Sequence, residues 1–495
     1  MPGKSPMQRR EFLGGALAGL GSLLPGCGGG GGGPPMGMVT PGVARALVQG
    51  QPLRTLAPLA NASAEPGLFS ATLAAAPASL ALVEGSPTAL WLYNGSFPGP
   101  VIDVREGTRV RVSLENRLAL DTTAHWHGLP VPADQDGNPM DPVPPGATRA
   151  YEFDIPAGTA GTYWYHPHAH GTTAEQVAMG LAAPFIVRTP DDPLAQFPEV
   201  TMLVTGIRLG GGGQVSPNGP MDIAVGRQGE MLLVNGGRVP VHVMRPGATQ
   251  RWRILNATSA RYLRLALDGH ALTLVGTDGG LLAAPVGPLA EVLVAPAQRV
   301  ELLVTASAVP GARFTLRAQR HAIDSMGMGI YAPEDLLTVA TTTETPAPPL
   351  PIPAALRPIA DPGAAVAAKR LVLTQSGMGM MGGSLGFLIN GRAFEMGRVD
   401  LVSRVGDVEA WEIVNATMMD HPIHVHGTQF QLASREFAGR VTPAPYAAWI
   451  DTVDVPSGTT ATIKVRQDLP GKRMVHCHIL EHEDAGMMAV LEARP

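Results

Sequence analysis

Three copies of one strand pattern recur along this 495-residue chain and restrict its fold more than any other feature. In each copy an apolar run ends in Asn-Gly, a turn follows, and a second run then alternates between apolar and polar residues. The Asn-Gly pairs are Asn94-Gly95, Asn235-Gly236 and Asn390-Gly391, and the alternating runs end at Asn116, Asn256 and Asn415. Asn-Gly between two such runs is typical of a β-hairpin, and a repeat at long, regular spacing indicates one domain present three times. The sequence therefore predicts an all-β chain of three consecutive β-sandwich domains.

Composition agrees with many short strands. The chain has 60 glycines and 47 prolines, and only 16% of its residues are charged, which favours strands and turns over long helices. The net charge of −5 gives no basic footprint, so we expect no nucleic-acid partner. The two cysteines, Cys27 and Cys477, each suit another role, and we expect no disulfide.

The first 45 residues are predicted to be an export segment. Gln8-Arg9-Arg10-Glu11-Phe12-Leu13 resembles a twin-arginine motif, and the apolar run behind it is too short to span a membrane permanently. Leu24-Pro25-Gly26-Cys27 resembles a lipobox, although Pro25 departs from the usual residue there. Two interpretations stay open: Cys27 carries a lipid anchor, or the segment is cleaved and the protein released. Either one predicts export to the periplasm or to the membrane surface of the cell envelope.

A cluster near the C-terminal end carries the chemistry. His476, Cys477 and His478 are followed by His482 and Met487. A Cys thiolate, His nitrogens and a weak axial Met form the ligand set of a blue-copper electron-transfer site. Successive side chains of a strand point to opposite faces, so Cys477 should serve one metal site while its two histidine neighbours serve another.

Further histidines complete the second metal site. His-x-His pairs occur at His125/His127, His166/His168, His424/His426 and His476/His478, and His421 is left free to join Cys477 and His482. Zinc is disfavoured because its structural sites commonly use several cysteines. The remaining histidines are His170, His242, His270 and His321. His242 and His270 are predicted to be structural, and His321 is a candidate for a peripheral copper site.

These segments resemble those of the multicopper oxidases, over essentially the whole chain behind the export segment. The nearest likeness is to the bacterial periplasmic copper-efflux oxidases, through His-Trp-His-Gly-Leu (125–129), His-Gly-Thr-Gln-Phe (426–430) and the run from His476 to Met488. The resemblance implies three cupredoxin-like Greek-key β-sandwich domains. We expect these at 46–190, 191–344 and 368–495, with a Pro/Ala-rich linker at 345–367. Domains 1 and 3 hold the ligands, and domain 2 should act as a spacer.

The resemblance also implies four copper ions and a ligand for each. The type 1 copper is held by His421, Cys477, His482 and Met487, the type 2 copper by His125 and His424, and the type 3 pair by His127, His166, His168, His426, His476 and His478. A reductant, either a small molecule or a metal ion, gives electrons to the type 1 copper, whose imidazoles should approach the surface. O2 is reduced to water at the other three coppers, and we expect the protein to be a monomer.

Two carboxylates are candidates for proton delivery to oxygen. The resemblance places Asp136 and Glu483 beside the oxygen-reducing site, where such donors are needed. Both could instead orient histidines through N–H hydrogen bonds. Without the resemblance, Asp136-Gly137 would be interpreted as an ordinary turn and Glu483 as a solvated carboxylate of a loop.

The substrate is left open. Met326-Gly-Met328 and Met378-Gly-Met380-Met381 could attract Cu(I), or could simply be flexible packing residues. Met419 matches a family methionine of a substrate copper site, but Thr417 replaces the acid expected two residues before it. Asp420 could instead accept a proton from a phenol. Three hypotheses remain. They are a laccase-like oxidase of phenols, aromatic amines and/or Cu(I), a dedicated Cu(I) or Fe(II) metallo-oxidase, and a copper-free scaffold. The complete ligand set disfavours the scaffold, and the threefold repeat disfavours a two-domain nitrite reductase.

Overall fold

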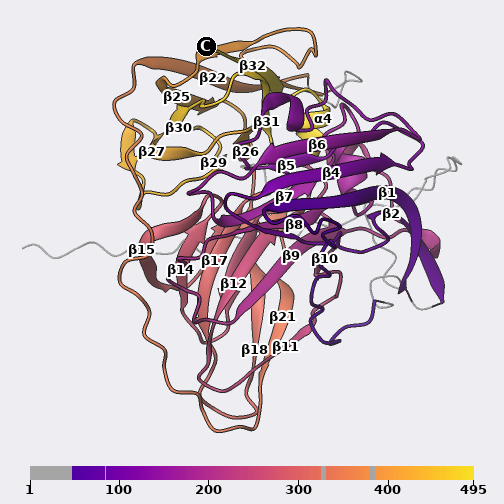
Figure 1. Ribbon diagram of the computed structural model, residues 1–495, viewed down its shortest axis with the longest axis vertical. Coiled ribbons are helices and arrows are strands. Elements are labelled where there is room, and N and C mark those ends of the chain that lie inside the picture. Colours follow the sequence, from indigo (N-terminus) through magenta and orange to yellow (C-terminus); the bar gives the residue numbers. More distant parts are fainter. Residues whose placement is uncertain (1–46, 84, 325–329, 378–384) are drawn as a thin grey trace, which may run out of the picture. The chain divides into compact units, whose positions relative to one another are not determined.

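The computed structural model describes residues 47–495 except 84, 325–329 and 378–384 (Figure 1). The expected export segment with Cys27 and both methionine clusters lie outside these residues. In the described part, six large sheets follow one another in three pairs along the chain, and each pair encloses its own apolar core. The predicted all-β architecture of three β-sandwich domains is confirmed.

Domain 1 is built from two four-stranded sheets (indigo to purple in Figure 1). One has the order β2 (Ser86–Tyr93), β1 (Leu68–Val83), β4 (Arg109–Asn116) and β6 (Thr148–Asp154). The other has the order β3 (Ile102–Arg105), β8 (Ala183–Arg188), β7 (Gly161–His166) and β5 (His125–His127). The short helices η1 (Ala133–Gln135) and α2 (Thr173–Ala178) lie in its loops.

Domain 2 pairs a six-stranded with a five-stranded sheet. The first has the order β10 (Met231–Val234), β9 (Glu199–Ile207), β12 (Thr249–Asn256), β17 (Arg299–Thr305), β14 (Leu272–Thr277) and β15 (Gly280–Leu289). The second has the order β11 (Val241–Met244), β21 (Glu334–Thr341), β18 (Arg313–Gln319), β13 (Leu263–Leu267) and β16 (Val292–Val294). A small sheet of β19 (His321–Ala322) and β20 (Ile330–Tyr331), with η2 (Gly211–Gly213) and α3 (Pro220–Val225), completes it.

Domain 3 repeats the arrangement of domain 2 (orange to yellow in Figure 1). Its six-stranded sheet has the order β23 (Gly386–Ile389), β22 (Ala367–Ser376), β25 (Val408–Asn415), β30 (Thr459–Arg466), β27 (Phe430–Phe437) and β28 (Arg440–Pro443). Its five-stranded sheet has the order β24 (Leu401–Arg404), β32 (Met488–Arg494), β31 (Gly471–Cys477), β26 (His421–Val425) and β29 (Thr452–Val455). Helix α4 (Leu480–Asp484) follows β31.

The repeated Asn-Gly pairs are hairpin turns of one kind. Both residues of each pair have positive φ, for example 49° and 70° at Asn94 and Gly95, as a type I′ turn requires. The Asn side chain also accepts a hydrogen bond from the neighbouring strand in all three domains, from the backbone N–H of Ala74, Leu203 and Val372. The pattern in the sequence thus reflects one hydrogen-bonded turn that each domain uses.

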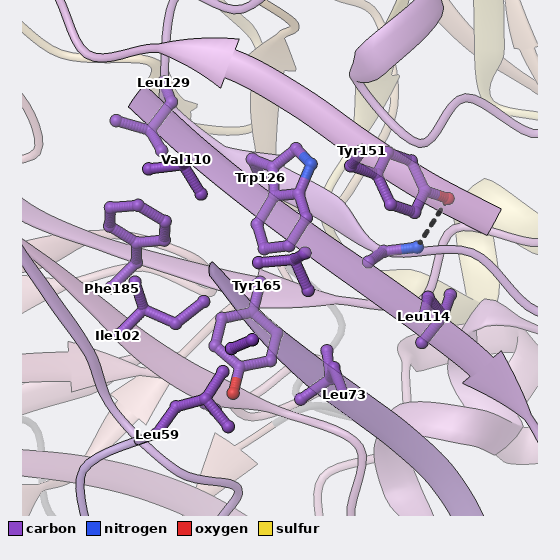
Figure 2. Close-up of a cluster of buried hydrophobic side chains, with 14 of the residues drawn as sticks. Leu59, Leu73, Ile102, Val110, Leu114, Trp126, Leu129, Tyr151, Tyr165 and Phe185 are labelled. Carbon is purple, nitrogen blue, oxygen red and sulfur yellow. Dashed lines mark hydrogen bonds between the residues drawn. The ribbon is translucent and has the colours of Figure 1, made fainter. Parts of the chain in front are cut away.

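Strand alternation separates the core of domain 1 from the metal-binding face. Figure 2 shows Trp126 packed among Val110, Leu129, Tyr165 and Phe185. Because neighbouring side chains of a strand point to opposite faces, the residues on either side of Trp126, which are His125 and His127, point away from this core. Among the residues that the structure describes, no helix is long and apolar enough to cross a membrane.

Candidate metal centre

Four strand ends bring eight imidazoles together between domains 1 and 3. In domain 1 β5 pairs with β7 so that His125 lies opposite His166, and in domain 3 β26 pairs with β31 so that His424 lies opposite His476. Rings from the two domains then stack on each other: His125 on His426 and His127 on His424, each with centroids 3.8 Å apart. All members of the cage are fully buried: His125, His127, His166, His168, His424, His426, His476 and His478.

Backbone carbonyls fix the orientation of several of these rings. Nδ1 of His125 donates to the carbonyl of Asp136, and Nδ1 of His424 donates to the carbonyl of Asp451, each at 2.8 Å. Nδ1 of His166 donates to the Pro167 carbonyl. The Nε2 atoms of these three rings have no hydrogen-bond partner among the described residues. Their lone pairs therefore point into the cage.

The cage fits a metal because most of its imidazoles are neutral and offer a nitrogen without a hydrogen-bond partner among the described residues. Burial lowers the pKa well below the ordinary value for most of its members, which are His127, His166, His168, His424, His426 and His478. Neutral imidazoles offer lone pairs, and buried polar atoms without partners are costly unless a ligand satisfies them. Nε2 of His476 lies 3.2 Å from Nε2 of His168 and 3.0 Å from Nε2 of His426, close enough for one shared ion. An all-imidazole donor set suits copper.

A second cluster lies on the other face of β31. Sγ of Cys477 is 3.4 Å from Nδ1 of His421 and 3.9 Å from Nδ1 of His482, and all three residues are fully buried. Met487 is buried in the same apolar cluster as Cys477, and its carbonyl accepts the Cys477 backbone N–H at 3.0 Å. A thiol and two imidazoles so arranged, with a thioether buried in the same apolar cluster, are the donor groups of a blue-copper site. The predicted alternation of His476, Cys477 and His478 is present.

Burial sets the protonation of this second cluster. It lowers the pKa of His421 to about 3 and raises the pKa of the Cys477 thiol above its ordinary value. The Thr417 hydroxyl accepts a hydrogen bond from Nε2 of His421 at 2.8 Å and donates its own hydrogen to Asn415. The Nδ1 lone pair of His421 is thereby directed at Cys477.

The histidines of this cluster do not reach the surface, contrary to expectation. His421 and His482 are both fully buried because domain 2 covers them. Helix α3 contacts α4, and at Gly226, just after α3, an added Cβ would lie 2.3 Å from the Ala260 Cβ and 2.7 Å from the Ile479 Cγ2. This cover could not be predicted from the sequence, since α3 begins about 260 residues before α4.

The two predicted acids lie against the cage in matching positions. The Asp136 carboxylate is 3.2 Å from Nδ1 of His125 and 3.1 Å from Nδ1 of His426. The Glu483 carboxylate is 3.2 Å from Nδ1 of His476 and 3.5 Å from Nδ1 of His168. Both acids are buried, so each is an acid enclosed between two imidazoles.

The four histidines outside the predicted ligand sets make other contacts. His242 bonds Gln250, His270 stacks on Phe314, and His170 is exposed next to Phe394. His321 stacks on Tyr262 and lies 3.7 Å from the Asp420 carboxylate, beside buried Met419.

Sequence reasoning missed Asp451 and Arg299. Asp451 accepts a hydrogen bond from Nε2 of His127 at 3.0 Å, and Arg299 of domain 2 holds Asp451. No histidine motif marks either residue, and the pair Asp451–His127 is separated by 324 positions.

The fold and the two clusters define a copper-binding protein of β-sandwich domains. Sequence profiles described as multicopper oxidase match residues 76–192, 162–342 and 366–495. A laccase of Bacillus stratosphericus is 30% identical over 82% of this chain and 91% of its own length. This chain therefore belongs to the multicopper oxidase family, whose members are three-domain cupredoxin-like oxidoreductases that pass electrons from a reductant to O2.

Solved structures agree with this assignment. The multicopper oxidase of Campylobacter jejuni, described as a metallo-oxidase, is 38% identical with a TM-score of 0.86, and the match covers 91% of this chain and 97% of that one. A laccase-like multicopper oxidase of Ochrobactrum, described as acting on lignin model compounds, is 28% identical with a TM-score of 0.78, covering 89% and 100% of the two chains.

Proposed function

We propose that this multicopper oxidase holds four copper ions in the two clusters. His421, Cys477, His482 and Met487 bind the type 1 copper, His125 and His424 bind the type 2 copper, and the type 3 pair takes the other six residues of the cage, which are His127, His166, His168, His426, His476 and His478. The observation that carries this proposal is the number of buried imidazole nitrogens that face one another without partners.

The chain's own residues connect and shield the two clusters. Copper, when bound, supplies the one-electron steps and the reduction of O2 to water. Cys477 is joined through two peptide bonds to His476 and His478, so covalent bonds alone link the thiolate to the cage. Burial of every ligand excludes water from both clusters. We infer that Asp136 and Glu483 hold and deliver protons at the imidazole edge of the cage, because both lie within reach of it.

For the substrate we propose phenols, aromatic amines and/or Cu(I). At His421 the hydrogen-bond partner is the neutral Thr417 hydroxyl, and Met419 is only 4% exposed, so an acid–methionine copper site is incomplete there. A dedicated Cu(I) or Fe(II) metallo-oxidase is the second candidate, favoured by the similarity to the Campylobacter jejuni protein described as a metallo-oxidase.

Oxygen uptake by the copper-loaded protein separates the two candidates. We expect turnover of a phenol such as 2,6-dimethoxyphenol without added copper, with Cu(I) and Fe(II) oxidised no faster. If Cu(I) or Fe(II) is oxidised efficiently and the phenol is not, the metallo-oxidase hypothesis replaces the laccase-like one.

Substitution of Cys477 tests the copper assignment itself. Cys477→Ser removes the thiolate, so we expect the intense blue absorption and the oxidase activity to be lost while the cage still binds copper. Absorption spectra and copper content per chain measure this. Retention of the blue absorption would show that Cys477 is not the type 1 ligand.

We further propose that the protein is exported as a folded monomer and acts at the cell envelope, with Cys27 as the candidate site of a lipid anchor. The arguments are the twin-arginine-like and lipobox-like residues of the first 45 positions. Cell fractionation of the wild type and Cys27→Ala tests this proposal, since loss of the anchor should release the protein from membranes. Light scattering of the purified protein tests the monomer.

A further inference from the structure

One arginine of domain 2 contacts all three domains beside the cage. Arg299 begins β17 and is fully buried. Its Nε donates to the carbonyl of Thr162 on β7 in domain 1 at 2.8 Å, and its backbone N–H donates to Asp278 of domain 2 at 2.8 Å. Both Nη atoms donate to the carboxylate of Asp451 in domain 3, Nη1 at 2.8 Å. A paired guanidinium of this kind fixes both the place and the plane of the carboxylate.

Asp451 in turn holds two imidazoles of the cage. Its Oδ1 accepts from Nε2 of His127 at 3.0 Å, and its backbone carbonyl accepts from Nδ1 of His424 at 2.8 Å. Nε2 of His127 therefore carries the proton, and Nδ1 of the same ring, buried and without a partner among the described residues, faces the cage. His127 thus presents the opposite nitrogen from His125 and His424, whose Nε2 atoms are the unpaired ones.

The Asp451 carboxylate is already occupied on both oxygens. Besides Arg299 and His127, Oδ1 accepts from the Thr452 hydroxyl at 2.9 Å and Oδ2 from the Gln429 amide at 3.0 Å. Although Asp451 lies within a metal-binding distance of His127 and His424, its oxygens are used by these donors. Asp451 is therefore an acceptor that orients a ligand, and the residue that aligns it is Arg299.

The glycine of the His-Trp-His-Gly run supports the same junction. Gly128 has a φ of +87°, and a Cβ added to it would lie 2.3 Å from Oδ2 of Asp451 and 2.8 Å from Nη2 of Arg299. The residue after His127 must therefore be small because the Asp451–Arg299 pair fills the space beside it.

We infer that Arg299 is a positioning residue for the oxygen-reducing centre: through Asp451 it sets which nitrogen of His127 faces the cage. This inference rests on the proposed function, since the cage must bind copper. Without the guanidinium, the Asp451 carboxylate loses the two hydrogen bonds that fix its plane and can rotate away from His127. That rotation weakens the acceptor that holds His127. Loss of a group that orients a ligand typically lowers metal affinity by about 10- to 100-fold.

Arg299→Met and Arg299→Lys test the inference, with Arg251→Met as the control. Arg251 is 3% exposed, and its side-chain partners among the described residues are the carboxylates of Glu301, Asp192 and Glu199. We measure copper content per chain, the electron paramagnetic resonance spectrum of the type 2 copper, the near-ultraviolet absorption of the type 3 pair, the blue absorption, and the unfolding midpoint of the copper-free protein.

We expect Arg299→Met to keep the blue absorption but to lose or alter the type 2 and type 3 signals, with copper affinity of the cage lowered about 10- to 100-fold. Arg299→Lys should alter the same signals less, because it keeps the positive charge. It also provides the test if Arg299→Met does not fold. Arg251→Met should leave the signals unchanged even where it lowers the unfolding midpoint. Normal type 2 and type 3 signals in both Arg299 variants, or the same loss in Arg251→Met, would overturn the inference. A wild-type protein without these signals would instead overturn the proposed function.

Discussion

At the scale of single residues, the cage has two buried acids with matching surroundings. Asp136 comes from domain 1 and contacts one histidine of domain 1 and one of domain 3. Glu483 comes from domain 3 and also contacts one histidine of each of these two domains. An acid enclosed by two imidazoles can either orient them or supply a proton. The structure permits both roles, and the kinetics of reoxidation distinguish them.

Glu483→Gln should slow the oxygen reaction selectively. The amide keeps the size and an acceptor oxygen but holds no transferable proton, so we expect kcat to fall by about 100- to 10,000-fold. Anaerobic reduction of the blue copper by substrate should proceed at the wild-type rate, while reoxidation by O2 is slowed. Stopped-flow absorption of the blue band measures both steps.

Asp484→Asn is the matched control. Asp484 is the next residue along the chain, and its carboxylate accepts from the backbone N–H groups of Thr173 and Ala174. Burial and the neighbouring Glu483 raise its pKa well above the ordinary value, so the neutral amide resembles the state it already has. Equal reoxidation in Glu483→Gln and Asp484→Asn would contradict proton delivery, and loss of cage copper in Glu483→Gln would indicate an orienting role.

The histidines could be identified from the sequence because each pair is local. A spacing of two residues on a strand places His125 and His127 on the same face, independently of how the rest of the chain folds. Asp451 and Arg299 could not be identified, because they meet His127 and each other only after three domains have packed together. Their residue types are also common in ordinary ion pairs.

At the scale of elements, the hairpins could be predicted but the covering loops could not. Asn94-Gly95 and its repeats carry their turn geometry in two residues. Helix α3 has only six residues, and its position over α4 depends on contacts made at Gly226. Short helices in long loops have no periodic pattern from which a sequence could reveal them.

The loop that carries Asp136 depends on Gly137. This residue has a φ of +70°, and an added Cβ would lie 2.1 Å from the carbonyl oxygen of Ala124, which is backbone and cannot move aside. We expect Gly137→Ala to displace Asp136, lowering the activity and the unfolding midpoint together. Thermal unfolding and oxygen uptake measure these effects.

Gly146→Ala provides the control for backbone strain in the same region. Gly146 has a φ of +76° with nothing within 4 Å of its added Cβ, so this substitution carries the strain of positive φ alone, about 1 kcal/mol. The Gly137 variant should be clearly the less stable of the two. Similar losses in both would show that crowding at Ala124 does not matter.

At the scale of the whole molecule, domain 2 is more than the expected spacer. It holds the Asp451 carboxylate through Arg299 and covers the cluster around Cys477 with α3, although among the described residues it contributes no histidine to either cluster. Charged residues also join it to domain 1: Glu199 accepts from Arg253 of domain 2 and from Arg188 of domain 1, each at 2.7 Å. The stability of this junction should therefore depend on the ionisation of Glu199.

Acid should weaken the junction of domains 1 and 2 through Glu199. Burial alone would raise its pKa, but the guanidinium groups of Arg253 and Arg251 outweigh burial and lower the pKa from 4.5 to about 2. A carboxyl with a lower pKa folded than unfolded binds fewer protons when folded, so its contribution is complete above pH 4.5 and is lost as the pH falls towards 2. The shift corresponds to about 3 kcal/mol at most.

We therefore expect Glu199→Gln to destabilise the protein at pH 7 and progressively less between pH 4.5 and pH 2, as measured by urea unfolding. Glu152→Gln, which removes an exposed partner of Arg111, should change stability little at any pH. A difference between wild type and Glu199→Gln that stays constant with pH would show that Glu199 does not couple the domains through its charge.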